Sequence, residues 1–509
     1  MATTTRVPRF AVRLSLLGLL FASGLSHSEE TKDWDISPNL GLELAYTSNL
    51  DLTPDNEIDS FISRINPGIG ISQAGRNLKL GVDYSLSLVN YSSEKHSNDY
   101  YHNLNAFADA ELVDDRLFLD TRATVSQELI DNRNSGIGDP SVAPDSYTST
   151  LTFVITPTWK QRIGDYTNIG ISATYDAVIY ERGDNEDSES LEYNFFADTH
   201  DNPNKVYWTL EARQDNARPR GGDTSLVKED FIEAQLGYRY SRQLNLRAGG
   251  GYIDNHVKFS TDPSLEAGSF WSAGLTWNPT PRANLDMYYS SQVQTGSGQG
   301  LTFTNRHKYS FWSLSYNKSL SSTRDELLQF APVGSAICPD TVDFSLNDDC
   351  TIVGAGEQAI AGPGEQVVGL FTPISTPNEG RFIREALNAN VSYRRSKSTV
   401  TFGLFGIQRT YQNLNGRVEE DYGVNAGWAL RLSGRTSANI DLNWSILEPN
   451  TNETITERDH KQGVNLGLTR RLSTDTSVKT ALRFNKLHSD DPSRDYDEYG
   501  ASVSLNHTF

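Results

Sequence analysis

Apolar and polar side chains alternate with a period of two along nearly the whole chain, and this alternation restricts the fold more than any other feature. One segment places its apolar side chains at Leu78, Leu80, Val82, Tyr84, Leu86 and Leu88, and a later one at Ala438, Ile440, Leu442, Trp444 and Ile446. Helical spacing of apolar residues is nearly absent. Each segment has about the ten residues that a strand needs to cross a membrane, more than the usual ~5–6 residues of soluble strands. The pattern therefore predicts an all-β fold, a transmembrane antiparallel up-and-down β-barrel.

The connections between these segments alternate in length. Short turns are expected at 73–76 and 113–116, whereas 129–146 and 254–267 are longer loops rich in acidic or small polar residues. Bacterial barrels join their strands in this way, with short periplasmic turns and longer extracellular loops. The alternation therefore predicts that both termini lie on the periplasmic side of the outer membrane.

The number of strands follows from parity. Fourteen strands are legible before Lys318 and seven after Ile383, with 293–304 taken as a loop. Bacterial barrels have an even number of strands. We therefore predict a turn at 318–323 and one more strand at 323–330, which gives about 22 strands, with 20 as the alternative. Residues 331–381 then form one long extracellular insertion.

The two ends of the chain carry address signals. Arg6, Arg9 and Arg13 precede an apolar run, and small residues follow it, so residues 1–28 are predicted to be a cleaved signal peptide. The barrel then occupies 29–509. Few residues precede its first strand, so we expect no N-terminal plug, which disfavours a TonB-dependent receptor or an usher. At the other end, the closing strand has the alternation and terminal aromatic residue that the barrel assembly machinery reads in bacterial outer-membrane proteins, at Tyr499, Val503, Leu505 and Phe509.

Composition limits the partners of the chain. The net charge of −20 argues against nucleic acid, which requires a basic patch. The 23 Tyr and 8 Trp suit the aromatic girdles of a barrel in contact with lipid and lipopolysaccharide. Cys338 and Cys350 are expected to form a disulfide within the insertion, since two thiols alone are too few for a metal site. No cofactor is predicted.

Two kinds of chemical site were weighed and set aside. Acidic runs at 181–189 and 340–349 could bind Ca²⁺, but neither has the spacing of an EF-hand loop, so solvated loops are the favoured interpretation. The nine His residues are scattered, and no nucleophile–base pairing is legible. The sequence therefore predicts no metal site, no catalytic residues and no enzyme activity.

The alternation also predicts which ionisable side chains face the lumen. Both signs of charge occur in similar numbers, which suits a rigid, wet lumen better than a single-sign ion funnel. The candidate lumen-lining residues are Lys79, Asp83, Asp109, Glu111, Asp120, Arg122, Asp176, Glu211, Arg213, Glu233, Arg239, Arg247, Asp286, Arg394, Arg431, Asp441, Lys479 and Arg483.

Several segments resemble one family of bacterial barrels. They lie at 46–52, including Ser48-Asn49-Leu50-Asp51, and at 64–70, 76–84 and 110–120. Their order is similar to that in the outer-membrane proteins associated with the PEP-CTERM/exosortase system, although that family often has a second Asn in the first segment. The resemblance implies a link to exopolysaccharide production in Gram-negative bacteria, and it carries no catalytic residues over to this chain.

Three functions are compatible with these features. The leading one is passage of exopolysaccharide or other solutes across the outer membrane, with polysaccharide or exopolysaccharide-export components as the expected partners. The second is a structural or adhesive surface barrel without a transport role. The third is an outer-membrane hydrolase, for which no residue pattern speaks.

Overall fold

The computed structural model describes most of the chain beyond the predicted signal peptide. The described residues are 34–129, 139–181, 187–199, 205–219, 227–257, 267–291, 297–329, 333–339, 351–354, 365–369, 381–411, 417–449 and 457–509. Within these ranges, no helix is both long and apolar enough to cross a membrane. The predicted signal peptide, 1–28, lies outside the described residues and stays a prediction.

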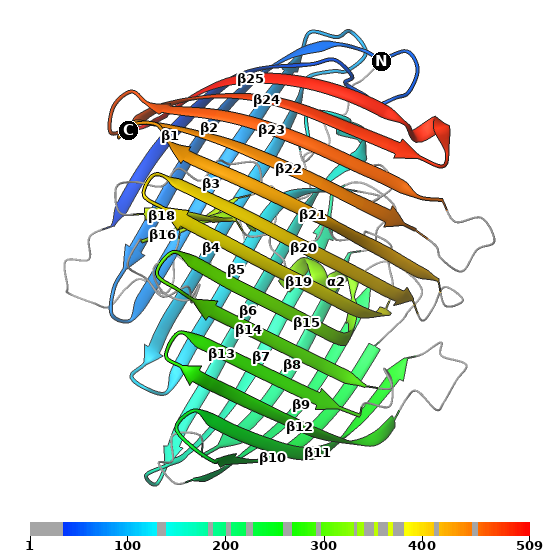
Figure 1. Ribbon diagram of the computed structural model, residues 1–509. Helices are drawn as coiled ribbons and strands as arrows, with labels where there is room; N and C mark the ends of the chain where they lie inside the picture. Colours follow the sequence, from blue (N-terminus) through cyan, green and yellow to red (C-terminus); the bar gives the residue numbers. More distant parts are fainter. Residues whose placement is uncertain are drawn as a thin grey trace, which may run out of the picture.

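A single sheet of 22 antiparallel strands closes on itself, which confirms the predicted fold class (Figure 1). Each strand pairs with the next in sequence, because antiparallel neighbours can be joined by tight turns. The strands are β1 Asp35–Thr47, β2 Ser60–Ala74, β3 Leu78–Tyr91, β4 Asp99–Val113, β5 Leu117–Leu129, β6 Tyr147–Ile163, β7 Thr167–Tyr180, β8 Ser188–Asp198, β9 Val206–Pro219, β10 Val227–Arg239, β11 Leu244–Val257, β12 Ala267–Thr280, β13 Ala283–Ser290, β14 Gly298–Arg306, β15 Ser310–Ser322, β19 Arg381–Arg395, β20 Ser398–Tyr411, β21 Val418–Arg431, β22 Thr436–Glu448, β23 Asp459–Arg471, β24 Thr476–Ser489 and β25 Tyr496–Thr508.

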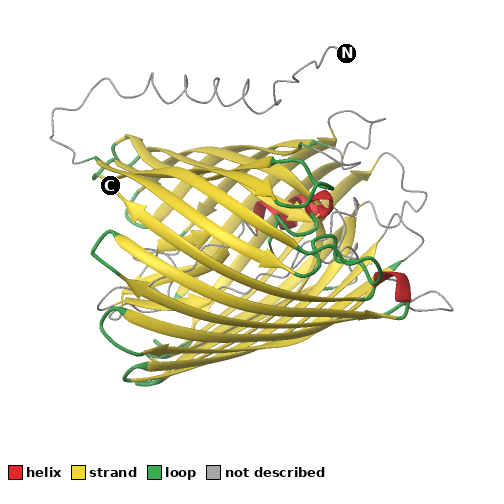
Figure 2. Cartoon of the chain, turned by 90° about the horizontal axis from the view of Figure 1, so that it is seen from above, coloured by secondary structure: helices red, strands yellow, loops and turns green. Residues whose placement is uncertain are grey.

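The last strand pairs with the first. Asn39 on β1 faces Thr508 on β25, and Thr47 faces Gly500. This pairing removes both free sheet edges, which a membrane does not tolerate because unpaired backbone groups find no water there. The start of β1 and the end of β25 therefore lie at the same end of the barrel, which also carries the short turns (Figure 2). We call it the turn end and the opposite end the loop end.

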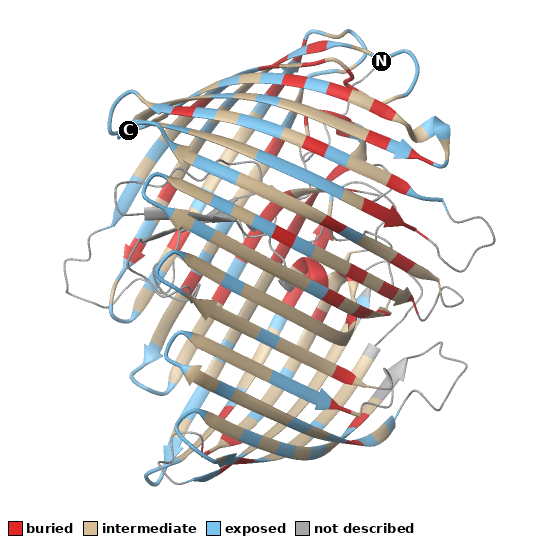
Figure 3. Ribbon diagram, in the orientation of Figure 1, coloured by how far each residue is buried: buried red, intermediate tan, exposed pale blue. Residues whose placement is uncertain are grey.

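The two faces of the wall differ as the period of two requires. Apolar side chains such as Leu44 on β1, 69 % exposed, and Trp271 on β12, 55 % exposed, point away from the lumen. On these strands the intervening residues point inward and are polar or small, except for Phe270 on β12, whose ring fills the space at Gly251. Buried positions gather toward the loop end (Figure 3). The outer face is thus an apolar band suited to lipid, as in outer-membrane barrels.

The count of 22 is right, but three of the predicted segments are wrong. Residues 293–304 were expected to be a loop, yet β14 covers Gly298–Arg306. Residues 318–323 are not a turn, because β15 continues to Ser322. Residues 323–330 are not a strand, because α2 spans Thr323–Gln329 as a helix. One strand, β14, was not predicted, and one predicted strand is a helix, so the total number of strands remained 22.

The predicted insertion lies between α2 and β19. It contains a separate three-stranded sheet of β16 Val333–Pro339, β17 Thr351–Gly354 and β18 Glu365–Gly369, with β16 in the centre. Since β15 is an odd-numbered strand of the barrel, the insertion leaves the wall at the loop end. Cys350 lies outside the described residues, so the disulfide with Cys338 stays a prediction.

Candidate functional site

The helix α2 lies inside the barrel near the loop end (Figures 1 and 2). It follows β15 directly, yet it also contacts β6 and β7, which are far from β15 in the order of strands around the wall. A helix that touches both of these regions must cross the lumen. Four of its residues, Thr323, Arg324, Asp325 and Glu326, are polar, and two of these make its strongest contacts with the wall.

Glu326 attaches α2 to the wall on the β19–β20 side. The Arg409 guanidinium on β20 donates from Nε to Oε1 at 3.2 Å and from Nη2 to Oε2 at 3.0 Å. The Arg384 Nε on β19 lies 2.8 Å from Glu326 Oε1. Arg409 also donates through Nη1 to Glu419 on β21 at 3.0 Å. Such a fork-to-fork arrangement fixes orientation as well as charge balance.

These ions are closed off from water. The side chains of Glu326 and Arg409 are 2 % and 1 % exposed, and the Phe382 ring lies 5.8 Å below the Arg409 guanidinium. A buried pair of this kind adds little net stability, but removing one partner costs roughly 3–5 kcal/mol, because the other charge stays buried and unbalanced. The contact therefore fixes the position of α2 strongly.

Arg324 attaches α2 to the far wall. Its Nη2 pairs with the carboxylate of Asp176 on β7. A second connection spans the lumen nearby, since the Arg381 Nη2 on β19 lies 3.6 Å from Glu229 on β10, which also accepts a hydrogen bond from Arg213 on β9 at 2.7 Å. Opposite walls of the barrel are thus joined through ion pairs. We call α2 with these pairs the α2 latch.

A second segment, 139–146, folds inward from the loop between β5 and β6. Asp139 accepts hydrogen bonds from Arg64 on β2 at 2.9 Å and from Arg483 on β24 at 2.8 Å. Burial alone would raise the pKa of the Asp139 carboxyl, but the two guanidinium groups outweigh it and hold the pKa well below its usual range. Asp139 therefore stays ionised and joins walls on either side of the β1–β25 closure.

Apolar contacts complete the docking of this segment. Val142 and Leu50 are both fully buried in a cluster with side chains of β1 to β4. The backbone N–H of Ala143 donates to the Leu50 carbonyl at 2.7 Å, and the Tyr101 hydroxyl donates to the Pro140 carbonyl at 3.1 Å. We call this segment, with its contacts, the Asp139 latch. Both latches lie at the loop end.

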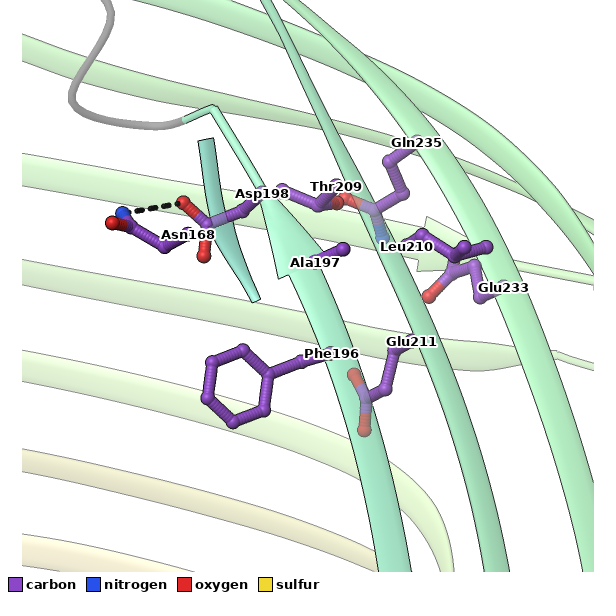
Figure 4. A pocket seen from close by; sticks show the side chains of 9 residues that line it. All are labelled: Asn168, Phe196, Ala197, Asp198, Thr209, Leu210, Glu211, Glu233 and Gln235. Carbon is purple, nitrogen blue, oxygen red and sulfur yellow. Dashed lines mark hydrogen bonds between the residues drawn. The ribbon is translucent and has the colours of Figure 1, made fainter. Parts of the chain in front are cut away.

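A polar recess lies on the wall between β7 and β10, nearer the turn end (Figure 4). Its volume is about 560 Å³. Glu211 on β9 and Glu233 on β10 face each other across neighbouring strands, and Glu233 accepts a hydrogen bond from Ser272 at 2.6 Å. Within the described ranges, no group of three or more His, Cys, Asp or Glu side chains is arranged to hold a metal ion. The recess therefore offers negative potential without a metal site.

The structure brings some of the predicted lumen residues into contact. Arg247 pairs with Asp286 at 2.7 Å. Arg394 and Arg431 lie at the ends of β19 and β21. The pairing registers put all the candidates on the strand face opposite the exposed apolar band, at Lys79, Asp83, Asp109, Glu111, Asp120, Arg122, Asp176, Glu211, Arg213, Glu233, Arg239, Arg247, Asp286, Arg394, Arg431, Asp441, Lys479 and Arg483. That they line a passage stays a prediction.

The residues that make the latches were not predicted from the sequence. Arg384 and Arg409 follow the same alternation as the predicted lumen residues, so the period of two could have identified them. Glu326 could not be found in this way, because its segment was expected to be a strand. Asp139 lies in a loop, where alternation carries no information.

Comparison with known proteins gives the fold and no family. No protein-family model matches the chain, and no curated protein matches its sequence. Among solved structures, the ferric enterobactin receptor PfeA of Pseudomonas aeruginosa superposes with a TM-score of 0.52 at 10% identity, covering 94% of this chain and 81% of that one. The siderophore receptor PirA of Acinetobacter baumannii gives 0.51 at 8% identity, with 94% and 81% covered. The FrpB iron transporter of Neisseria meningitidis gives 0.50 at 9% identity, with 96% and 83% covered.

These likenesses concern architecture alone, because identities of this order are far too low to carry residues across. The chain shares with these receptors and this transporter a closed antiparallel barrel. The comparisons find the barrel and say nothing of exosortase-linked proteins.

Proposed function

We propose that the protein is an outer-membrane passage barrel for exopolysaccharide or other polar solutes, closed at the loop end by its two latches. The observation that carries this proposal is the α2 latch. A helix held across a polar lumen by Arg324–Asp176 on one wall and Glu326–Arg409 on the other lies where a solute would have to pass, and ion pairs attach it to the wall.

The exopolysaccharide assignment rests on the resemblance of segments such as Ser48-Asn49-Leu50-Asp51 to the exosortase-associated family. We place the turn end in the periplasm, and the loop end, with the insertion, outside the cell. Lipid, lipopolysaccharide and the barrel assembly machinery are the partners that this placement requires, with export components joining at the turn end.

The test is deletion of the gene followed by measurement of surface polysaccharide, with the protein restored from a plasmid. A passage protein predicts loss of surface polysaccharide and accumulation in the periplasm, both reversed by the plasmid. Normal surface polysaccharide in the deletion strain would contradict the export assignment.

A structural barrel is the second candidate, since the same buried ion pairs knit distant strands into a rigid wall. The two functions differ in conductance. Purified protein in a planar lipid bilayer conducts ions in at least a fraction of openings if it is a passage barrel. A folded barrel that stays silent with both latches broken is a scaffold.

A further inference from the structure

One row of lumen-facing residues differs from its neighbours by carrying no charge. The row crosses nine consecutive strands, each member facing the next in the pairing register. Its members, from β13 to β24, are Asn284, Thr304, Ser313, Asn390, Gly403, Asn425, Asn443, Gly463 and Asn485. Five are Asn, so we call it the amide row. The parallel row through Ser392, Thr401 and Gly427 reaches Asp441 and Arg483 instead.

The amide row runs from one end of the barrel to the other. Asn284 is the second residue of β13, beside a short turn, whereas Asn485 lies near the end of β24 at the loop end. Because the strands of a barrel are tilted, a row of paired residues winds up the wall as it crosses them. With strands spaced by ~4.8 Å, eight steps cover about 38 Å.

Glycines hold the amides flat against the wall. A Cβ at Gly403 would lie 2.2 Å from the Asn425 Oδ1 and 2.8 Å from the Asn390 Oδ1. At Gly463 it would lie 2.1 Å from the Asn443 Oδ1. Each glycine therefore leaves the space into which a neighbouring amide leans, and the wall stays smooth along the row.

The amides offer hydrogen-bonding groups that carry no charge. Each Asn has two N–H donors and one carbonyl acceptor, which match hydroxyl groups that both donate and accept. A cation would prefer the carboxylates Glu211 and Glu233 on the other wall, and a polyanion would be repelled by a chain of net charge −20.

The row ends where the Asp139 latch begins. The Asn485 Nδ2 donates to the Glu498 carboxylate at 3.0 Å, and Glu498 accepts from Arg483, which in turn donates to Asp139. Anything that follows the row toward the loop end therefore arrives beneath this latch.

We propose that the amide row is the contact path of a neutral, hydroxyl-rich carbohydrate chain along the lumen. The inference rests on the passage function proposed above and adds the substrate class and the wall that it follows. The path offers many weak, repeated hydrogen bonds and no charge at which a chain would stall. Passage requires such contacts, because a tight single site would hold the chain in place.

The test is equilibrium binding to the folded, detergent-purified protein, measured by calorimetry with neutral hexasaccharides (maltohexaose, cellohexaose and isomaltohexaose) and with an anionic oligogalacturonate of the same length. We expect at least one neutral hexasaccharide to bind at least tenfold more tightly than the oligogalacturonate. The double variant N425L/N443L, which removes two amides of the row, is expected to weaken this binding about tenfold.

The matched control is N194L on β8, half-way round the barrel in strand order, which should bind as the unaltered protein does. Equal weakening by N194L and N425L/N443L, no effect of N425L/N443L, tighter binding of the oligogalacturonate, or binding of none of the neutral sugars would each overturn the amide row. Retained heat-modifiable migration on unboiled gels verifies that each variant is folded. Conductance in the same preparation tests passage separately: binding without conductance would refute the passage function and leave the row as a carbohydrate surface.

Discussion

Neutralising Glu326 should release α2 from the wall. The substitution Glu326→Gln keeps the size of the side chain and removes the charge that faces Arg409 and Arg384. Arg409 retains Glu419, but the docked α2 then offers no negative charge to either guanidinium. Because Glu326 is only 2 % exposed, water cannot take the place of the lost charge.

The size of the effect follows from the burial of the pair. Breaking a buried ion pair by removing one partner costs roughly 3–5 kcal/mol. Each 1.4 kcal/mol is a tenfold change in an equilibrium constant. The undocked population of α2 should therefore rise by about 10²–10³-fold, and Arg324→Gln, which breaks the link to Asp176 on the far wall, should add to it.

The assay is single-channel recording in planar bilayers, with open probability as the readout. Glu385→Gln is the matched control, since Glu385 adjoins Arg384 in sequence but faces outward, where it pairs with Lys318 at 2.6 Å. We expect a higher open probability for Glu326→Gln and an unchanged open probability for Glu385→Gln. If folded Glu326→Gln protein conducts no more than unaltered protein, α2 does not obstruct the lumen.

Three further predictions concern the second latch, the wall and the carboxy terminus. Because the pKa of Asp139 is depressed in the folded protein, its contribution to docking is complete above its unfolded pKa of about 3.9 and is lost progressively as the pH falls from there toward the depressed pKa. The open probability should therefore rise when the pH is lowered below about 4. Asp139→Asn should abolish this pH dependence. Gly237→Val should destabilise the barrel by about 1–3 kcal/mol, because a Cβ there would lie 2.0 Å from the Tyr207 ring. The measurement is the temperature of heat modification, which should fall. Gly434→Ala, with open space around the glycine, should leave this temperature unchanged. Phe509→Ser should lower the yield of assembled barrel in cells without lowering the unfolding temperature of the barrel that forms, since the side chain is 71% exposed and its ring contacts His507.

The glycine–ring and glycine–amide contacts explain why the alternation of side chains is hard to recognise from the sequence of some strands. At Gly300 the Tyr288 ring occupies the space of the missing side chain, and at Gly81 the Phe107 ring does so. A strand with glycines on one face shows little alternation, and this is why β14, with Gly298 and Gly300, was expected to be a loop. The pairing with β13 and β15, which no local pattern encodes, makes it a strand.

The helix α2 is a second element that the local sequence does not predict. The segment Thr323–Gln329 has two apolar residues, Leu327 and Leu328, and too little length for a period to be read from it. Contacts with β7 and β20, distant in sequence, stabilise the helix, since Asp176 pairs with its Arg324 and Arg409 pairs with its Glu326. Short elements take the structure that their tertiary contacts favour.

The sequence alone determined the fold class, because a period of two sustained over so many segments gives each strand one apolar and one polar face, which a closed barrel accommodates. The even number of strands came from the general rule for bacterial barrels. The sequence also determined which face each side chain takes, since alternation is a local property of the strand. The tertiary structure decided what the lumen contains. Register fixes which inward residues become neighbours, so the amide row and the two latches exist only once Asn390 lies beside Gly403 and Arg409 lies beside Glu326.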